Sequence, residues 1–566
     1  NVIITKIKNN EKILIDINYP LYLGIDLGDA NCKLSLINHP NNEIKLISFK
    51  KDLYSIPTVI FFNSKKEEIK IGYEAENQGI KEPSQIIFNL LKYIGINYNE
   101  IKGIKELLPF KIYKNEQNNR PYVEIDFNGQ KNKLFYFEDL LSLFLQKLFQ
   151  QFFDKIIINN NNNKTINLFI GLSMPNYLSY LQKKIIEKIF CNQLFYPNVK
   201  YNDYKINLIN INLENSPNTA CLYDITKKGS YSKDDNILII YTDRCSINLA
   251  IVNKNNNKKL YDIKAVESAA FGEEDLIDNY LLYCIRNLEN KYNFDFTKAP
   301  SIIDQLGKKI SSAKNNFDII PKAHINLDTK NTGAEMYVKN IDIILTKDDY
   351  ERSCDEFFKK IIMFIKNIID KSLLSIQNID DIILIGQISK SIKIKTLLIN
   401  IFRENEKIID KLVSYPVNKE LDIEYSIVIG CALQAMNNNL LNKHYSFIDI
   451  CPSSFGVESI NGIMEIIIQK GNKFPCKNKK LVKLNNKNDN ICINIYEGEN
   501  KCIKNNKYII SVNIDKSNFS KNILKDFIEV FIQLEIDNNN NLKCFVFEPN
   551  TKNIFECLIN INVVKN

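Results

Sequence analysis

The chain has 566 residues, of which 45% are hydrophobic and 25% charged, and its formal net charge is +8. This length exceeds what one compact core supports, so at least two domains are expected, and the composition is ordinary for a globular protein. The sequence contains no run of about 18 uncharged apolar residues, so no membrane-spanning helix is expected. Three histidines and 13 cysteines without a CxxC pair argue against a zinc site and favour reduced thiols.

Strand-like and helix-like runs alternate over most of the chain, which is the pattern of an α/β domain. Residues 21–49 contain three strand-like runs around a glycine turn. Apolar residues at helical spacing over 136–158 predict a helix that ends in an asparagine tract. Residues 168–190 predict a strand, a proline turn and a helix.

The pattern changes after residue 437. Residues 438–448 are polar and predict a linker. Residues 449–566 contain short strand-like runs separated by turn signals, which is typical of a β-sandwich.

Three segments have the form of phosphate-handling turns: GIDLGDANC (24–32), NILIIYTDRCSINLAIV (236–252) and DIILIGQISKSIKIKTLL (381–398). Their order and spacing resemble the phosphate-1, phosphate-2 and adenosine segments of the Hsp70 chaperones, which are actin-like ATPases. Further segments resemble the family in the same order, namely 71–78, 214–229, 269–285, 310–317 and 423–435.

The resemblance implies the whole architecture. An actin-like (ribonuclease H-like) two-lobed ATPase domain is expected over 1–437, followed by a linker at 438–448. An all-β sandwich of the peptide-binding type is expected over 449–566. The sequence ends where the family's β-domain ends, so no helical lid is expected.

The resemblance also implies a degenerate nucleotide site. Five residues keep the family pattern: Asp26, Gly28, Gly272, Lys314 and Gly386. Two structural alternatives stay open. Asp26 and Gly28 could be present only because the turn after the strand needs them, and Lys314 could be a solvated lysine on the surface of a helix.

Most groups that hold and hydrolyse ATP in the family are replaced. Asp29 and Ala30 take the place of two threonines, and Leu91, with Lys92 beside it, takes the place of the lysine near the attacking water. The other replacements are Ser216, Tyr241, Asp243, Arg244, Cys245, Asn248, Gln387, Lys390 and Glu424. Carboxylates repel phosphates in a poorly solvated cleft, and side chains in place of glycines crowd the approach of backbone amides.

These replacements predict a pseudo-ATPase. No catalytic residue and no metal site are expected, and ATP is bound without hydrolysis or not at all. Tyr241 is expected to fill the space of the metal. Arg244 is open to two interpretations, a phosphate contact or a surface ion pair.

The β-domain and linker carry weaker signals. Met464, Ile491 and Ile493 fall where the family has peptide-contacting residues, although apolar residues alternating along a strand also suit core packing. The linker sequence KHYSFID lacks the family's leucine run, so ordinary coupling between nucleotide and peptide sites is expected to be lost.

Within the family, this combination most resembles Ssz, the non-hydrolysing subunit of the ribosome-associated complex. The resemblance implies a cytoplasmic scaffold for a zuotin-like J-domain protein, which stimulates a separate active Hsp70 chaperone on nascent chains. Contact with the ribosome would be indirect, without a membrane and without sequence-specific nucleic-acid binding. Three alternatives stay open: a nucleotide-exchange-type cochaperone, an active ATP-dependent protein-folding chaperone, and an actin-fold scaffold unrelated to ribosomes.

Overall fold

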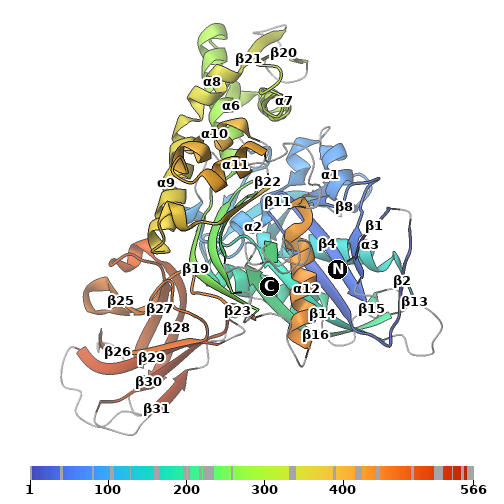
Figure 1. The fold of residues 1–566 in the computed structure, drawn as a ribbon. Helices are drawn as coiled ribbons and strands as arrows, with labels where there is room; N and C mark the ends of the chain where they lie inside the picture. The colour runs from blue at the N-terminus through green and yellow to red at the C-terminus, as the bar shows by residue number, and fades with distance from the viewer. Residues whose placement is uncertain are drawn as a thin grey trace.

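The structure is a computed structural model of the chain, and the elements below belong to the residues that it describes. These are 3–9, 11–38, 43–79, 82–101, 108–127, 129–158, 165–195, 200–201, 204–215, 219–220, 235–255, 259–330, 340–386, 391–414, 423–440, 446–485, 490–515, 527–537, 540–549 and 554–557. Figure 1 shows two lobes built on separate sheets, with a β-domain beside them. None of the helices within these ranges is long and apolar enough to cross a membrane.

Lobe 1, the described residues between 3 and 215, is built on a mixed sheet. Its strand order is β1-β5-β4-β3-β14-β16-β15, with β6 paired to β4. Both faces of β3 are buried, as expected for a strand covered on two sides. The strands are β1 (Ile3–Ile7), β3 (Leu21–Leu27), β4 (Asn31–Asn38), β5 (Glu43–Ile47), β6 (Ile56–Pro57), β14 (Thr165–Met174), β15 (Lys200–Tyr201) and β16 (Tyr204–Asn215).

Smaller elements complete lobe 1. They are β2 (Ile13–Ile15), β7 (Ile60–Asn63), β8 (Glu68–Ile71), α1 (Gly72–Gly79), β9 (Ile86–Ile87), α2 (Leu90–Tyr93), β10 (Tyr113–Lys114), β11 (Pro121–Phe127), β12 (Gln130–Tyr136), α3 (Phe137–Phe153), β13 (Ile156–Ile158) and α4 (Tyr180–Ile189). The helix predicted over 136–158 therefore ends at Phe153. Three consecutive β-branched isoleucines follow as β13, which pairs in parallel with β2.

Lobe 2, the described residues between 235 and 414, has a five-stranded sheet in the order β22-β17-β18-β19-β23. Its strands are β17 (Asp235–Thr242), β18 (Ile247–Asn255), β19 (Leu260–Ala269), β22 (Asp381–Gly386) and the added β23 (Ser446–Ile448). Most of its helices lie at the upper left of Figure 1, beyond the sheet. The remaining elements are α6 (Glu273–Tyr292), α7 (Pro300–Lys314), β20 (Lys322–Leu327), β21 (Ile341–Thr346), α8 (Lys347–Ser353), α9 (Asp355–Lys371), α10 (Ile392–Ile401) and α11 (Glu406–Ser414).

Helix α12 (Ser426–Asn439) joins the two lobes. Val428 packs in the core of lobe 1, while Ile427 packs against the sheet of lobe 2. Close packing on lobe 1 requires glycine in the sheet, since a Cβ on Gly24 would lie 2.2 Å from the Val428 carbonyl oxygen. The lobes are therefore held at one end by a shared buried helix.

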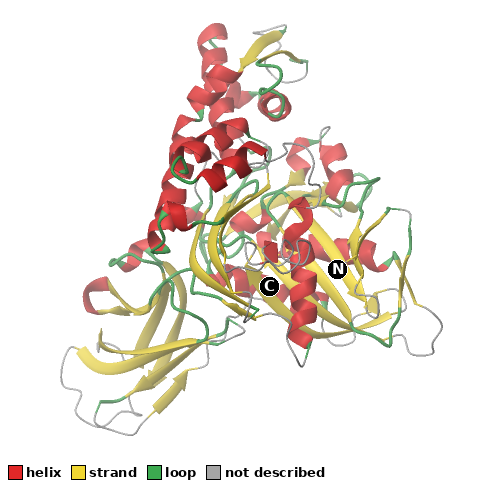
Figure 2. Cartoon of the chain, in the orientation of Figure 1, coloured by secondary structure: helices red, strands yellow, loops and turns green. Residues whose placement is uncertain are grey.

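The β-domain is a sandwich of two four-stranded sheets, ordered β25-β24-β27-β28 and β26-β29-β30-β31. Figure 2 shows it built mainly of strands, with short helical turns and loops between them. Alternate residues of β27 and β29 point into a common apolar core. The strands are β24 (Phe455–Ser459), β25 (Ile463–Ile468), β26 (Cys476–Asn485), β27 (Asn490–Glu497), β28 (Lys507–Asp515), β29 (Phe527–Ile536), β30 (Leu542–Phe547) and β31 (Ile554–Cys557).

The predicted linker contributes a docked strand. Although KHYSFID lacks the family's leucine run, its residues 446–448 form β23 and pair in parallel with 260–262 of β19. The rings of Tyr261 and Phe447 stack there, with 4.9 Å between their centroids. Backbone pairing and this stack replace the expected leucine contacts, so strand docking does not need the leucine run.

Side chains also fix the sandwich to both lobes. Tyr180, at the start of α4, is buried against the sandwich core. Its backbone N–H donates to Glu497 Oε2 at 2.7 Å, and its hydroxyl accepts the Leu542 N–H at 2.9 Å. On lobe 2, Lys473 Nζ lies 2.8 Å from an Asp262 carboxylate oxygen. Lys470 Nζ lies 3.3 Å from both carboxylate oxygens of Glu267.

Candidate functional site

The two predicted phosphate turns contact each other directly across the lobes. The first turn follows β3 and the second joins β17 to β18. Between them, the Asp29 N–H donates to Asp243 Oδ2 at 3.0 Å. A Cβ on Gly28 would lie 2.6 Å from the same oxygen and 2.9 Å from the Asn31 carbonyl oxygen, so a larger residue would push the Asp243 side chain away. The side chain of Asp243 thus occupies a backbone donor of the first turn.

The carboxyl of Asp26 has a partner within its own hairpin. Asp26 is buried, and Lys33, directly opposite it on β4, places Nζ 3.0 Å from its Oδ2. The ion pair neutralises the one carboxylate that the sequence keeps from the family pattern. Lys33 was not among the residues predicted for the site.

Asp29 is a second buried carboxyl, and it is held in a neutral form near neutral pH. It is 1% exposed and accepts the hydroxyl of Tyr177 at 3.0 Å. Burial, and secondly the nearby charge of Asp243, raise the pKa of Asp29 to about 8, although the Tyr177 hydrogen bond opposes them. Burial likewise raises the pKa of Asp243.

The amino end of α6 is satisfied by the second turn. The Glu273 N–H donates to the Asp243 carbonyl at 3.3 Å, and the Glu274 N–H donates to the Arg244 carbonyl at 2.8 Å. The Gly272 N–H donates to Asp275 Oδ2 at 2.8 Å. A helix amino end with free N–H groups is a ready anion site, but these three donors are already bonded within the protein.

Gly272 is itself required by this packing. A Cβ there would lie 2.4 Å from the Asp243 carbonyl oxygen. Behind the turn, Tyr241 is buried in the apolar core of lobe 2. Its strand partner Asn248 accepts the Asn176 N–H at 3.1 Å. Tyr241 and Asn248 are therefore both engaged in packing or hydrogen bonding within the protein.

A network centred on Glu274 spans the lobes. Arg244 approaches it at 3.4 Å and Lys92 at 3.5 Å, while Asn89 Nδ2 and Cys245 Sγ donate to it at 3.0 and 3.1 Å. Burial raises the pKa of Glu274, but the two cations and these donors outweigh burial and lower it to about 2. Lys92 is thus engaged in an ion pair, and Leu91 beside it is fully buried.

Arg244 lies in the cleft and connects the lobes. Its guanidinium lies 5.0 Å from the ring centre of Phe88 in lobe 1 while it contacts Glu274 in lobe 2. The alternative of an ion pair is confirmed, and the side chain is 34% exposed on the wall of the cleft.

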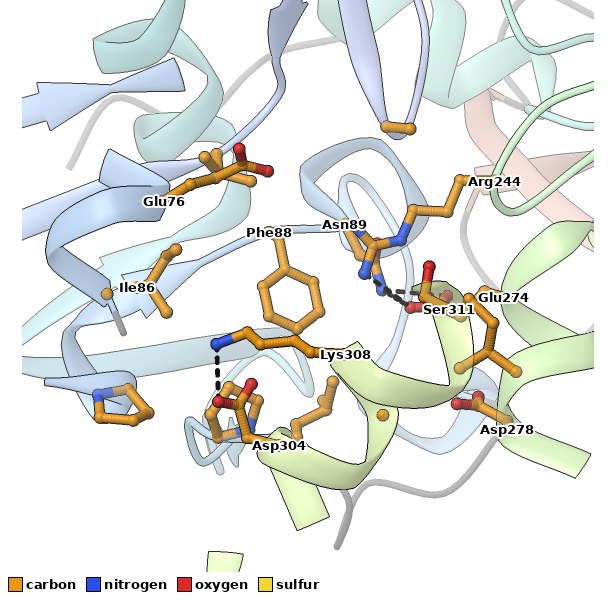
Figure 3. Close-up of a pocket in the computed structure, with 18 of the residues that line it drawn as sticks. Glu76, Ile86, Phe88, Asn89, Arg244, Glu274, Asp278, Asp304, Lys308 and Ser311 are labelled. Carbon is orange, nitrogen blue, oxygen red and sulfur yellow. Dashed lines mark hydrogen bonds and ion pairs between the residues drawn. The ribbon is translucent and has the colours of Figure 1, made fainter. Parts of the chain in front are cut away.

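A cavity of about 610 Å³ opens beside this network, between α1, α2, α6 and α7. Figure 3 shows Arg244 directed toward Glu274 on one side, Glu76 on the opposite side, and the Lys308–Asp304 pair below. Burial, and then the charges of Glu274 and Asp275, raise the pKa of Asp278 to about 7. The cavity is lined by more acidic than basic side chains, which is an unfavourable lining for a triphosphate. The acidic residues are Glu76, Glu273, Glu274, Asp278 and Asp304, and the basic ones are Lys92, Arg244 and Lys308.

The remaining two predicted nucleotide residues lie farther into lobe 2. The side chain of Lys314 is only 9% exposed and forms an ion pair with Glu273 beside a cavity of about 270 Å³, so the alternative of a solvated lysine is wrong. Gly386 has a φ of +84°, and a Cβ on it would lie 1.9 Å from the Thr242 carbonyl oxygen. Gln387, Lys390 and Ser216 lie outside the described residues.

The structure thus divides the predicted residues into groups. Asp26, Gly28 and Gly272 gather around the Asp243 turn, and Gly386 pairs with Thr242 directly before that turn. Lys314 pairs with Glu273 at the start of α6. Their role in nucleotide binding stays a prediction.

The predicted peptide contacts are buried in the sandwich. Ile491 and Ile493 are fully buried in its core, and Met464 is 4% exposed and receives a hydrogen bond from Asn506 Nδ2 at 3.0 Å. These positions suit core packing, and a role in peptide binding stays a prediction.

A family model and a curated relative both match most of this chain. A family model described as Hsp70 protein matches residues 22–164 and 211–550. The heat shock cognate 70 kDa protein 3 of Dictyostelium discoideum is a similar relative, with 22% identity over 497 residues. The aligned region covers 86% of this chain and 72% of the relative.

Proposed function

Because this chain belongs to the Hsp70 family, we propose that it is a non-hydrolysing member that acts as a scaffold for a J-domain protein. Members of this family normally bind and hydrolyse ATP. The observation that carries the proposal is the direct bond between the two phosphate turns, from the Asp29 N–H to Asp243 Oδ2.

The hydrogen-bond donors and cations of the cleft are already paired within the protein. Phosphoryl transfer depends on backbone donors, cations and a metal arranged around the phosphates. In this cleft one turn donor and the donors at the start of α6 are bonded internally, and Lys33, Lys92, Arg244 and Lys314 all pair with carboxylates. Bound phosphates would have to displace these contacts, although the Asp29 carboxyl, which is protonated near neutral pH, would not repel them.

Phosphate release from Mg-ATP tests the loss of hydrolysis. The purified chain is expected to release no phosphate above a protein-free blank, while an active Hsp70 assayed in parallel does. The matched variant is D26N, which removes the family's first-strand carboxylate. Turnover abolished by D26N would contradict the proposal, whereas turnover that persists in D26N indicates a contaminating chaperone.

The proposed partner is a zuotin-like J-domain protein, in a cytoplasmic, ribosome-associated complex of the Ssz type. A scaffold needs a fixed conformation, and the docking of β23 on β19 together with the Tyr180 contacts supports one. The partner would stimulate a separate active Hsp70 on nascent chains, and this chain would touch the ribosome only indirectly.

Purification of the tagged protein from its native locus tests the partner. A J-domain protein in equal amount should persist at high salt, while ribosomal proteins should be lost as the salt is raised. Recovery of an active Hsp70 without a J-domain protein would instead favour an exchange-type cochaperone.

One observation favours a second candidate, an active ATP-dependent chaperone. The cavity of about 610 Å³ between the lobes is within the size range of ligand sites. The same phosphate-release assay with D26N separates the two candidates.

A further inference from the structure

Two cysteines meet in the sandwich where it docks on lobe 2. Cys451 follows β23, Cys476 opens β26, and their Sγ atoms lie 3.5 Å apart. Backbone bonds hold the first segment in place: the Cys451 N–H donates to the Asn472 carbonyl at 2.8 Å, and the Cys451 carbonyl accepts the Gly471 N–H at 2.9 Å. A disulfide requires an S–S distance of about 2.0 Å, so the two sulfur atoms must approach each other by about 1.5 Å.

The two thiols differ in environment and reactivity. Cys451 is fully buried, whereas Cys476 is partly exposed. The hydrogen bond between them, followed by burial, raises the pKa of Cys451, and the same hydrogen bond lowers the pKa of Cys476. Because the thiolate is the nucleophilic form, Cys476 is the sulfur that reacts first with a small oxidant.

We propose that Cys451 and Cys476 form a dithiol site that hydrogen peroxide oxidises to an intramolecular disulfide. In the first step the Cys476 thiolate attacks the peroxide; an S–O bond forms, the O–O bond breaks, and hydroxide leaves and takes up a proton as water. Cys476 is then a sulfenic acid. In the second step Cys451 sulfur attacks Cys476 sulfur; the S–S bond forms and the S–O bond breaks. The leaving hydroxide and the Cys451 proton make a second water.

The site lies at the docking contact of the domains. The disulfide would close a loop from Cys451 to Cys476, and the segment 470–473 lies within this loop. The segment carries the lysines that pair with Glu267 and Asp262 of lobe 2. Constraining this segment favours the conformations in which both ion pairs form. The proposal concerns the thiols alone and does not depend on the proposed scaffold function.

Peptide mapping of the full chain tests the proposal. The protein is treated with a small excess of hydrogen peroxide, its remaining thiols are alkylated with N-ethylmaleimide, and it is digested with trypsin without reductant. Trypsin cleaves after Lys443, Lys470, Lys473 and Lys477, so the disulfide would join two separate peptides, 444–470 and 474–477. The expected result is this linked pair, lighter by two hydrogens than the two free peptides and released by dithiothreitol.

Variants identify the roles of the two sulfurs. C476S should leave Cys451 reduced and alkylated, and C451S should trap the Cys476 sulfenic acid, detected with dimedone. The control C502S changes an exposed cysteine and should leave the linked pair unchanged. Three results on the unaltered chain would overturn the proposal: both thiols alkylated after peroxide, Cys476 over-oxidised without a link, or either cysteine linked to a different partner.

Discussion

Replacement of Asp29 by asparagine should stabilise the protein, and the gain should grow with pH. The carboxyl is 1% exposed and has a pKa of about 8, compared with 3.8 for an ordinary aspartate. Since the folded pKa is raised, the stability associated with the protonated carboxyl is fully present below pH 3.8. It is lost as pH rises toward about 8, because the unfolded chain ionises first.

The size of the effect follows from the two pKa values. One pKa unit corresponds to about 1.4 kcal/mol, so keeping this carboxyl protonated at pH 7 costs about 4 kcal/mol relative to the ionised unfolded chain. The introduced asparagine would not titrate and would still accept the Tyr177 hydroxyl. The difference in unfolding free energy between D29N and the original chain should therefore increase by about 3 kcal/mol from pH 5 to pH 7 and level off above pH 8.

Urea unfolding followed by circular dichroism at pH 5, 6, 7 and 8 measures this difference. The matched control is D295N, since Asp295 is a fully exposed carboxyl whose pKa is lowered by hydrogen bonds from Thr297. Both its folded and unfolded forms are ionised above pH 5, so its difference should stay constant. A D29N difference that is equally flat between pH 5 and 8 would refute the assignment of a neutral buried Asp29.

Three further substitutions test other contacts of the structure. G386A should lower the unfolding free energy by about 3 kcal/mol or more, because its Cβ meets the carbonyl at the end of β17. G471A has a similar φ of +86° with no atom within 4 Å of the added Cβ and should lose only about 1–2 kcal/mol, so equal losses in urea unfolding would contradict the close approach. R244A should lower the unfolding free energy by about 1–3 kcal/mol through loss of the Phe88 and Glu274 contacts, and an unchanged midpoint would argue against the inter-lobe link. K473Q should speed tryptic cleavage of the linker about twofold to fivefold at low salt, whereas K359Q, which alters an exposed ion pair within α9, should not.

The architecture could be predicted because it depends on local patterns in the sequence. Apolar runs that end in glycine identified β3 and β22, and the alternation of burial in β27 and β29 follows the strand period of two. The exception is β13, where three isoleucines continue an apolar helical pattern, and only their pairing with the distant β2 makes them a strand.

The interior of the cleft could not be predicted in the same way. Asp29 owes its neutral form to burial beside Tyr177 and Asp243, which are 148 and 214 positions away along the chain. The pairing of Lys314 with Glu273 likewise joins two helices. Lys33 is the residue that a closer sequence argument could have found, because a hairpin around the first turn places it opposite Asp26.

The contact between Asp29 and Asp243 also bears on what the protein senses. In a chaperone whose lobes close around a nucleotide, shape reports the cell's ratio of ATP to ADP. Here the lobes are joined by a hydrogen bond and an arginine contact encoded in the chain itself. A non-hydrolysing member built in this way would keep one conformation whether the concentration of ATP is high or low. Its assembly would then depend on the concentration of its partner and not on the concentration of ATP.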